Sequence, residues 1–389
     1  MTTIAEPSNG AYYSGRGDGQ QNQKWRDLPR LNPNDLTHPN SYLAPPGLVD
    51  AVNVALELGM PLLLTGEPGC GKSQLAYSLA WELDFPANAG EKLPQPLTFT
   101  VKSDTQSRDL FYHYDTLGRF RAAYAGNDNS EMENVSRYLR FEALGLAILR
   151  ALGHASIEEL GLAGCLDELS REPQRSVVLI DEIDKAPREV PNDILNEIER
   201  LSFDIPEIFE PGKPRTTVSL MNSHPNNDMM PLRPVVIITS NRERELPEAF
   251  LRRCVYYHLD LPPFRSEQSN VRGGSDDEVT IERIVEKRLG IAIQPEDAKP
   301  NHEKSLWAGG ISFFQYLRHE AQLQKSPSTA ELLNWMQLLH RHCRNADRLQ
   351  DQATLGLFRT SASVTLFKHK EDQERAAQLL DDWLSRPAV

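Results

Sequence analysis

The segment GEPGCGKS, residues 66–73, has the residue types and the spacing of a phosphate-binding loop, G-x-x-x-x-G-K-[ST]. Its glycines allow backbone N–H groups to turn toward phosphate oxygens. A helix expected to start near Gly71 would direct its positive end at the same oxygens. Lys72 would reach the β- and γ-phosphates, and the Ser73 hydroxyl would bind Mg²⁺. The residues expected around the nucleotide are Gly66, Glu67, Pro68, Gly69, Cys70, Gly71, Lys72, Ser73 and Gln74.

Two adjacent carboxylates follow a second apolar run, SVVLIDE, at Asp181 and Glu182. A buried strand that ends in acids places them at the carboxyl edge of a parallel sheet, where ligands bind in open α/β folds. Asp181 is suited to the magnesium shell, and Glu182 to activating an attacking water. An ordinary strand end with solvated acids is the alternative, and the phosphate loop upstream in the same chain disfavours it.

A third apolar run, PVVIITS at residues 234–240, leads to Asn241. Its amide has donors and an acceptor, so it can hold a phosphate oxygen and a water, although Asn is also a common turn or cap residue. Arg252 and Arg253 follow shortly afterwards, and either guanidinium could stabilise phosphoryl transfer in a neighbouring subunit. A solvated or ion-paired surface pair is the alternative for these two arginines.

Several elements must position these residues. Apolar spacing after Pro46 predicts a helix over residues 46–58, and PLLLTG predicts the strand that feeds the phosphate loop. Tyr42 and Leu43 precede this helix and are candidates for contacting the nucleobase. A further strand is expected over residues 96–103, and a helix over residues 189–201.

Other parts of the first two thirds are less regular. We expect a helix over residues 104–115, a hairpin tip at Gly118 and an apolar helix over residues 138–152. The aromatic residues Phe111, Tyr112 and Tyr114 belong either to the core or to a substrate-gripping loop, and burial statistics favour the core. Residues 154–175 are expected to be an insertion, and residues 202–231 a long excursion with a hairpin around RTTVSLM, in which 209–229 is a further addition.

Composition limits the classes of protein. The chain has 389 residues, a net charge of -13 and a sequence pI of about 5.3, which argues against a chain-wide nucleic-acid surface. No apolar run approaches the roughly 20 residues of a membrane span, and the first thirty residues lack the apolar core of a signal peptide. The four cysteines are far apart and suit free thiols in a reducing compartment, so the expected location is the cytoplasm.

The two ends of the chain differ in composition. Residues 1–40 are polar and rich in Gly, Asn and Gln, which predicts a disordered or extended arm, with Tyr12, Tyr13 or Trp25 as alternative docking residues. Residues 264–278 are expected to be a linker. Helical patterns then follow to the end of the chain, and Ser328 with Glu331 forms a capping box. The expected domains are an arm (1–40), an α/β nucleotide-binding domain (41–263) and an all-α lid (264–389).

In this order the motifs resemble an AAA+ ATPase, and more narrowly the MoxR family. The segments that carry the resemblance are LLTGEPGCGKS, LIDEIDKAP, VVIITSNRERELPEAFLRRC and KSPSTAELLNW. The resemblance implies an α/β fold with a P-loop parallel-sheet core sandwiched by helices, followed by a small all-α lid. It also implies Mg²⁺-dependent ATP hydrolysis, Asn241 as a phosphate sensor and Arg253 as an arginine finger, with Arg252 as the alternative.

MoxR-like proteins assemble as rings, usually hexameric, and remodel protein clients beside partners that carry a von Willebrand A domain. They have an insert facing the ring axis, which here would be residues 104–124. Where the family has an arginine at the second sensor, this chain has the run SPST, so Lys325 or Arg318 would substitute. Two other functions stay open: a nucleic-acid motor subunit like McrB, and a nucleotide-gated assembly switch with little turnover.

Overall fold

The computed structural model divides the chain into two units, Met1–His38 and Pro39–Val389. The residues that it describes are 38–88, 90–124, 135–162, 169–208, 215–220, 232–268, 278–294, 296, 299–343, 349 and 351–386. The predicted N-terminal arm, except its last three residues, therefore lies outside the described residues, as do Cys165 and most of the insertion after Ile208. The following description concerns the second unit.

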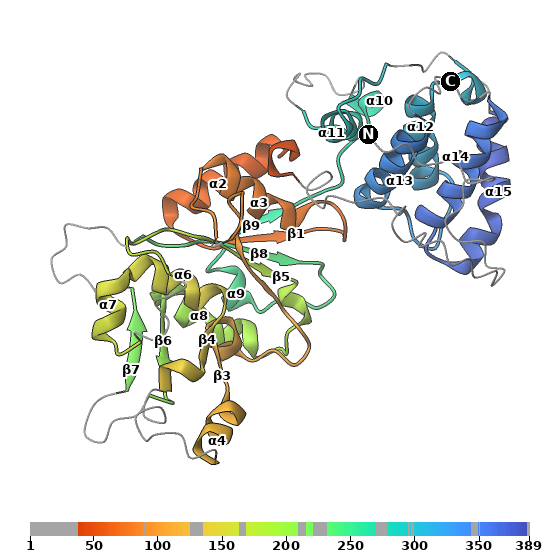
Figure 1. The fold of residues 1–389 in the computed structure, drawn as a ribbon. Helices are drawn as coiled ribbons and strands as arrows, with labels where there is room; N and C mark the ends of the chain where they lie inside the picture. Colours follow the sequence, from red (N-terminus) through yellow and green to blue (C-terminus); the bar gives the residue numbers. More distant parts are fainter. Residues whose placement is uncertain are drawn as a thin grey trace, which may run out of the picture. The chain divides into compact units, whose positions relative to one another are not determined.

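A five-stranded parallel sheet forms the centre of the first half of this unit (Figure 1). Its strands, in the order β2-β5-β8-β1-β9, are Leu97–Thr100, Val177–Asp181, Val235–Ser240, Leu62–Thr65 and Val255–His258. The predicted apolar runs before the phosphate loop, the acids and Asn241 are all strands. In a parallel sheet the carboxyl ends of these strands meet at one edge.

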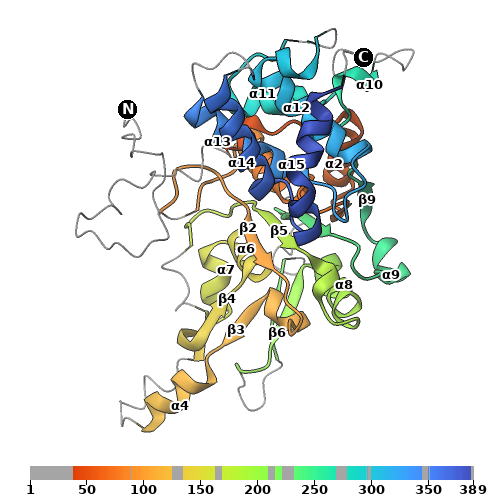
Figure 2. The same ribbon diagram turned by 90° about the vertical axis from the view of Figure 1, so that its right-hand side faces the viewer.

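Helices cover both faces of the sheet, as expected for strands that are apolar on both sides. On one face, α2 (Pro46–Leu58) and α3 (Lys72–Glu82) pack over Leu62 and Leu64. On the other face, α6 (Ala143–Leu152) and α8 (Val190–Arg200) share a second core with Leu63, and α6 lies along β2 and β5 (Figure 2). The predicted α/β class with a parallel sheet between helices is confirmed.

The region after β2 differs from the prediction. Residues 104–115 do not form a helix, because a 3₁₀ turn, η3 (Ser107–Leu110), leads directly into strand β3 (Tyr112–Tyr114). The aromatic side chains explain the change: Phe111 and Tyr112 are buried, and Phe111 stacks on Phe203 with ring centroids 5.0 Å apart. The preference for a core role is therefore confirmed for Phe111 and Tyr112, whereas Tyr114 is only partly buried against the same core.

Two neighbouring predictions need correction. Gly118 is no hairpin tip but lies in helix α4 (Thr116–Tyr124), whose first turn is capped by Asp115 Oδ1 accepting the Gly118 N–H at 2.8 Å. The helix predicted from Tyr138 begins only at Ala143. Before it lie η4 (Val135–Tyr138) and strand β4 (Leu139–Phe141), which pairs antiparallel with β3.

The remaining elements before the helical region are α7 (His154–Glu159), a 3₁₀ turn η6 (Ile183–Lys185), and strands β6 (Ser202–Ile205) and β7 (Thr216–Ser219). The two strands pair antiparallel, so the segment RTTVSLM does contribute to a two-stranded sheet. Helix α9 (Glu248–Leu251) then precedes β9.

The last third is helical, as predicted. Its helices are α10 (Arg265–Gln268), α11 (Ile281–Leu289), α12 (Leu306–His319), α13 (Thr329–His342), α14 (Gln352–Thr365) and α15 (Lys370–Leu384). Helix α10 occupies part of the expected linker, and α14 was not predicted individually. The core of this region includes Phe313, Trp335, Phe358 and Trp383. The capping box is present, because Ser328 N donates to Glu331 Oε2 at 2.7 Å and Glu331 N donates to Ser328 Oγ at 3.4 Å.

None of the helices among the described residues combines the length and the apolar character that a bilayer crossing requires.

Candidate functional site

The phosphate loop connects β1 to α3 through a backbone that requires glycine. Gly66, Gly69 and Gly71 have φ angles of 151°, 80° and 101°, in the region that side chains disfavour. A Cβ at Gly66 would lie 2.3 Å from the Leu259 carbonyl oxygen. Within the loop, Glu67 and Pro68 are exposed. The glycines thus fix a tight turn whose tip is open to solvent.

Lys72 begins α3 and is buried, with its ammonium turned back into the loop. The Nζ atom donates to the carbonyl oxygens of Gly66 at 2.8 Å and Glu67 at 2.9 Å. Cys70 is buried beside it, and burial raises the pKa of the Cys70 thiol even though the Lys72 charge opposes this. The loop therefore holds a localised positive charge, which a phosphate would engage.

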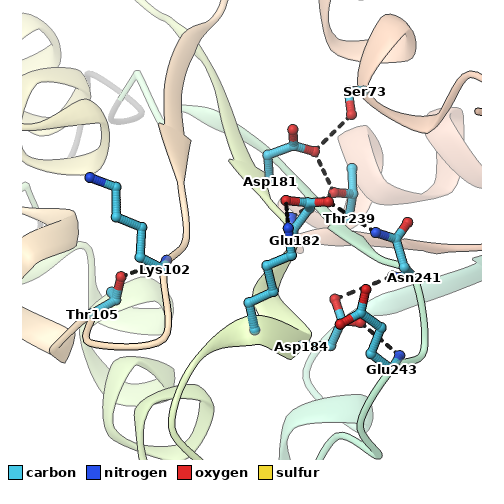
Figure 3. A network of polar contacts seen from close by, with 10 residues as sticks. Ser73, Lys102, Thr105, Asp181, Glu182, Asp184, Thr239, Asn241 and Glu243 are labelled. Atoms are coloured by element: carbon cyan, nitrogen blue, oxygen red, sulfur yellow. Dashed lines mark hydrogen bonds and ion pairs between the residues drawn. The ribbon is translucent and has the colours of Figure 1, made fainter. Parts of the chain in front are cut away.

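Asp181, the last residue of β5, contacts the first turn of helix α3 and the end of strand β8. Its Oδ1 atom accepts from Ser73 Oγ at 2.7 Å and from Thr239 Oγ1 at 2.6 Å (Figure 3). The strand register explains the second contact, because Ile180 of β5 lies opposite Ile238 of β8, which places Asp181 beside Thr239. Thr239 was not among the predicted site residues; its sequence signal is a hydroxyl residue, followed by Ser240, at the end of a run of apolar residues.

Glu182 follows in a left-handed backbone conformation, with φ 62°. Its N–H donates to Thr239 Oγ1 at 2.9 Å. Its carboxylate has two partners: Oε1 accepts from Asn241 Nδ2 at 3.0 Å, and Oε2 pairs with Lys185 Nζ at 2.5 Å. Hydrogen bonding to this carboxylate raises the pKa of Lys185. The structure thus brings the predicted Asn241 and Glu182 into direct contact.

Asp184 is a buried acid that sequence reasoning missed. Its two carboxylate oxygens accept the backbone N–H groups of Asn241 at 3.2 Å and Glu243 at 2.8 Å. This ties the turn after β5 to the chain after β8 (Figure 3). The position of Glu182 relative to Asn241 is therefore fixed by backbone contacts as well as by their own hydrogen bond.

These residues fit a magnesium ion that arrives with phosphates. Mg²⁺ is usually bound by one or two carboxylates together with substrate phosphates and waters, and a hydroxyl and a carboxylate meet here at Ser73 and Asp181. Among the described residues, no cluster of three or more His, Cys, Asp or Glu side chains could hold a metal on its own. The donor set thus suits an ion shared with a nucleotide.

Tyr42 supplies a buried hydroxyl with no hydrogen-bond partner. Its ring lies beside the phosphate loop, where a Cβ at Gly71 would be 3.4 Å from Tyr42 Cε2. Burial raises the pKa of this phenol. Next to it, Arg288 of α11 donates to Ser41 Oγ at 2.7 Å. An orphaned hydroxyl costs free energy until a partner arrives, so its position fits a polar ligand group at this end of the loop. Leu43 is only partly buried.

The helical region contacts the phosphate loop at two places. Ala330 N, at the start of α13, donates to the Gly69 carbonyl oxygen at 3.2 Å. Arg318 of α12 donates to the Pro327 carbonyl at 2.7 Å and lies 3.8 Å from Glu67 Oε2. Desolvation lowers the pKa of Arg318. Of the two proposed substitutes for the missing second-sensor arginine, Arg318 lies against the loop, whereas Lys325 is exposed.

Arg252 and Arg253 pair with acids of their own chain instead. Arg252 lies 3.1 Å from Glu248 Oε2, with side chains 79% and 84% exposed. Arg253 lies 3.3 Å from Glu199 Oε2, with side chains 41% and 60% exposed. Within the described part of the chain, their ion-pair partners are thus surface acids, and neither arginine pairs with a residue of the phosphate loop or of the turn after β5.

Comparisons with known proteins agree with this geometry. Residues 61–254 match the family described as AAA domain (dynein-related subfamily). No curated protein matches the chain. One similar solved structure is NtrX from Brucella abortus in complex with ADP, with 13% sequence identity and a TM-score of 0.34. The match covers 89% of this chain and 62% of that one.

Proposed function

From an AAA domain that spans residues 61–254, we propose that this chain binds Mg²⁺ and ATP at its phosphate loop and hydrolyses ATP to ADP and phosphate. The observation that carries the proposal is the chain of hydrogen bonds from Ser73 through Asp181 and Thr239 to Glu182 and Asn241. It joins a phosphate-binding element, a metal-binding acid and a base at one sheet edge, which is the set that phosphoryl transfer to water needs.

In this proposal the phosphate loop binds the triphosphate through its backbone N–H groups and Lys72. The Lys72 ammonium exchanges its two carbonyl acceptors for phosphate oxygens. Ser73 and Asp181 hold the magnesium ion, which neutralises charge on the phosphate oxygens. Tyr42 pairs its free hydroxyl with a polar group of the nucleotide.

Glu182 acts as the general base for the attacking water, and Asn241 orients it. Glu182 is only partly buried, with 28% of its side chain exposed, so water reaches its carboxylate. The Asn241 amide donates to one carboxylate oxygen and keeps its own oxygen available for the water or a phosphate. A general base of this kind contributes about 10²- to 10⁴-fold in rate.

The assembly extends the proposal. We infer a homo-oligomeric ring of the MoxR kind, most simply a hexamer, in which Arg253 or Arg252 reaches the nucleotide of the neighbouring subunit. Their exposure and weak surface pairing support this, because such pairs exchange partners at little cost. The same proposal divides the chain into a nucleotide-binding domain (41–263) and a lid (264–389). It also includes a cytoplasmic location and a protein client, beside a partner that carries a von Willebrand A domain. The net charge of -13 argues against nucleic acid as the client.

The test is steady-state ATP hydrolysis by the full chain and by Glu182→Gln, with particle mass measured in the presence of ATP. We expect the variant to bind ATP with the affinity of the parent and to lose ATP turnover. In the presence of ATP its particle mass should be that of the proposed oligomer. Equal turnover by the variant and the parent would contradict the assigned base. Turnover stimulated by DNA, with a steep salt dependence, would favour the McrB-like alternative instead. Tight binding with almost no hydrolysis by the parent would favour the assembly switch.

A further inference from the structure

Each carboxylate oxygen of Glu182 has a partner in this structure. Asn241 Nδ2 donates to Oε1 at 3.0 Å, and Lys185 Nζ contacts Oε2 at 2.5 Å. The first partner is a neutral amide, whereas the second is an ammonium. A charge-assisted contact holds a carboxylate oxygen more strongly than a neutral donor does. The lysine therefore occupies the Oε2 atom, for which an attacking water would have to compete.

The Lys185 contact is built into the turn. Glu182 adopts its left-handed conformation immediately before η6, and Lys185 N donates back to the Glu182 carbonyl oxygen at 3.0 Å. Ile183 and Asp184 between them are buried. Since Asp184 is in turn bound to the backbone after β8, the turn is held from both sides. The pairing of residues 182 and 185 is thus a consequence of the backbone path.

The contact is nevertheless easy to open. The Lys185 side chain is 40% exposed, and the ion pair lies partly in solvent. Ion pairs of this exposure are weak, since water competes for both partners. By contrast, Asp184, which accepts two backbone N–H groups from the chain after β8, is itself buried. The turn is thus fixed at Asp184, whereas the Lys185 side chain can leave Glu182. Such an arrangement restrains Glu182 reversibly.

We propose that Lys185 is a positioning residue that holds Glu182 away from the attacking water and thereby limits ATP turnover until the ion pair opens. The inference rests on the proposed ATPase function and adds a restraint within that site. Lys185 acts through Glu182. It is therefore expected to change kcat and to leave the affinity for ATP unaffected.

The experiment compares kcat and KM for ATP in the full chain and in Lys185→Met, Lys185→Arg and Lys185→Met combined with Glu182→Gln. We expect Lys185→Met to raise kcat about 2- to 5-fold, as suits the loss of an exposed ion pair, with KM unchanged. Lys185→Arg keeps a cation at this position and should stay near the parent rate. The double variant should be as slow as Glu182→Gln alone, because the lysine acts only through that carboxylate.

Lys102 offers a matched control. It lies at the carboxyl end of β2, the strand beside β5, and is exposed. Its side chain extends away from Glu182 (Figure 3), and its backbone N–H donates to Thr105 Oγ1 at 2.8 Å. Lys102→Met removes the same charge from the neighbouring strand without touching Glu182. It should therefore leave kcat unchanged.

The outcomes separate this inference from the function on which it rests. If the parent hydrolyses ATP and Lys185→Met has an equal or lower kcat, the restraint is overturned and the ATPase proposal stands. If Lys102→Met raises kcat as much as Lys185→Met, the increase comes from the loss of a positive charge near the site and not from the loss of the Lys185–Glu182 contact, so the restraint is overturned. If neither the parent nor Lys185→Met exceeds Lys72→Ala in hydrolysis, both proposals fail. Should Lys185→Met not fold, Lys185→Gln gives the same comparison with a polar side chain.

Discussion

The two sets of residues that we assign to phosphoryl transfer are held in very different ways. Ser73, Asp181, Glu182 and Asn241 are linked by hydrogen bonds of 2.6–3.0 Å, with Thr239 between them. Arg252 and Arg253 instead carry only exposed ion pairs to Glu248 and Glu199. One set is organised within the chain, and the other is free to change partners.

The difference has a physical origin. The first set lies at the ends of parallel strands whose register is fixed by the core, so backbone geometry delivers the side chains to one edge. The arginines follow a short helix, α9, and extend into solvent, where an ion pair contributes little. We infer that each chain positions the residues that activate water, Glu182 and Asn241, by its own fold. The arginines that stabilise charge are positioned only when two subunits come into contact. The predictions below test this division.

Removing the arginine finger should have the largest effect. Arg253→Ala is expected to lower kcat by about 10³-fold or more, because an arginine that stabilises the transferred phosphoryl contributes this much. ATP binding should change little, since no residue of the phosphate loop is altered. Hydrolysis measured above the concentration at which the particle assembles tests this prediction.

Arg252→Ala is the matched control for the finger, because it removes the same group one position earlier. Its ion pair with Glu248 stays within α9 and the residue after it, so the variant should retain most of the parent rate. The reverse result would exchange the roles of the two arginines. If neither variant changes kcat, no subunit contact completes the site and the proposed division is wrong.

The preorganised half should show its strongest response at Glu182. Glu182→Gln keeps the shape of the side chain but removes the proton acceptor, so kcat should fall about 10²- to 10⁴-fold. The amide can still contact Asn241, and ATP affinity should remain within a few fold of the parent. Single-turnover hydrolysis together with binding of a fluorescent ATP analogue separates the two quantities.

Thr239 tests whether the hydrogen-bonded chain itself matters. Thr239 is 1% exposed, and its hydroxyl donates to Asp181 and accepts from the Glu182 N–H. Thr239→Val preserves the volume but leaves this buried N–H unpaired, which should lower the free energy of unfolding by about 1–3 kcal/mol. Because Glu182 loses its support, kcat should fall as well. Urea unfolding and ATP hydrolysis measure the two effects.

Thr98→Val is the control for this change, since Thr98 is an exposed residue of β2, which lies in the same sheet but is separated from β8 by β5. The control should leave both stability and kcat close to the parent values. An equal loss in the two variants would mean that threonine at these positions serves only the strand backbone.

The sequence could predict that residues of the first set lie at strand ends, because its signals are local. Strand ends are indicated by the glycine loop, by the two acids after an apolar run and by the amide after another apolar run. The carboxyl ends of parallel strands lie at the same edge of the sheet, so these residues come together. Thr239 and Asp184 were missed because their importance depends on which strands are neighbours, and a single sequence does not state strand order. The helix predicted over residues 104–115 was wrong for a related reason: the burial of Phe111 and Tyr112 against β6 overrides local helix spacing.

Substitution of Tyr42 should have the smallest effect. Stability without nucleotide should be equal or slightly higher, whereas ATP binding should be weaker. Tyr42→Phe removes a buried hydroxyl that has no partner in the structure, so the free energy of unfolding without nucleotide should stay the same or rise slightly. If the hydroxyl pairs with the nucleotide, KM for ATP should rise about 5-fold, the loss of one neutral hydrogen bond, with kcat unchanged. Tyr77→Phe on α3, which is partly buried, is the control and should alter neither quantity. An unchanged KM in Tyr42→Phe would mean that this hydroxyl does not contact the nucleotide. Its lack of a hydrogen-bond partner would then only lower stability slightly, as a consequence of packing the ring beside Gly71.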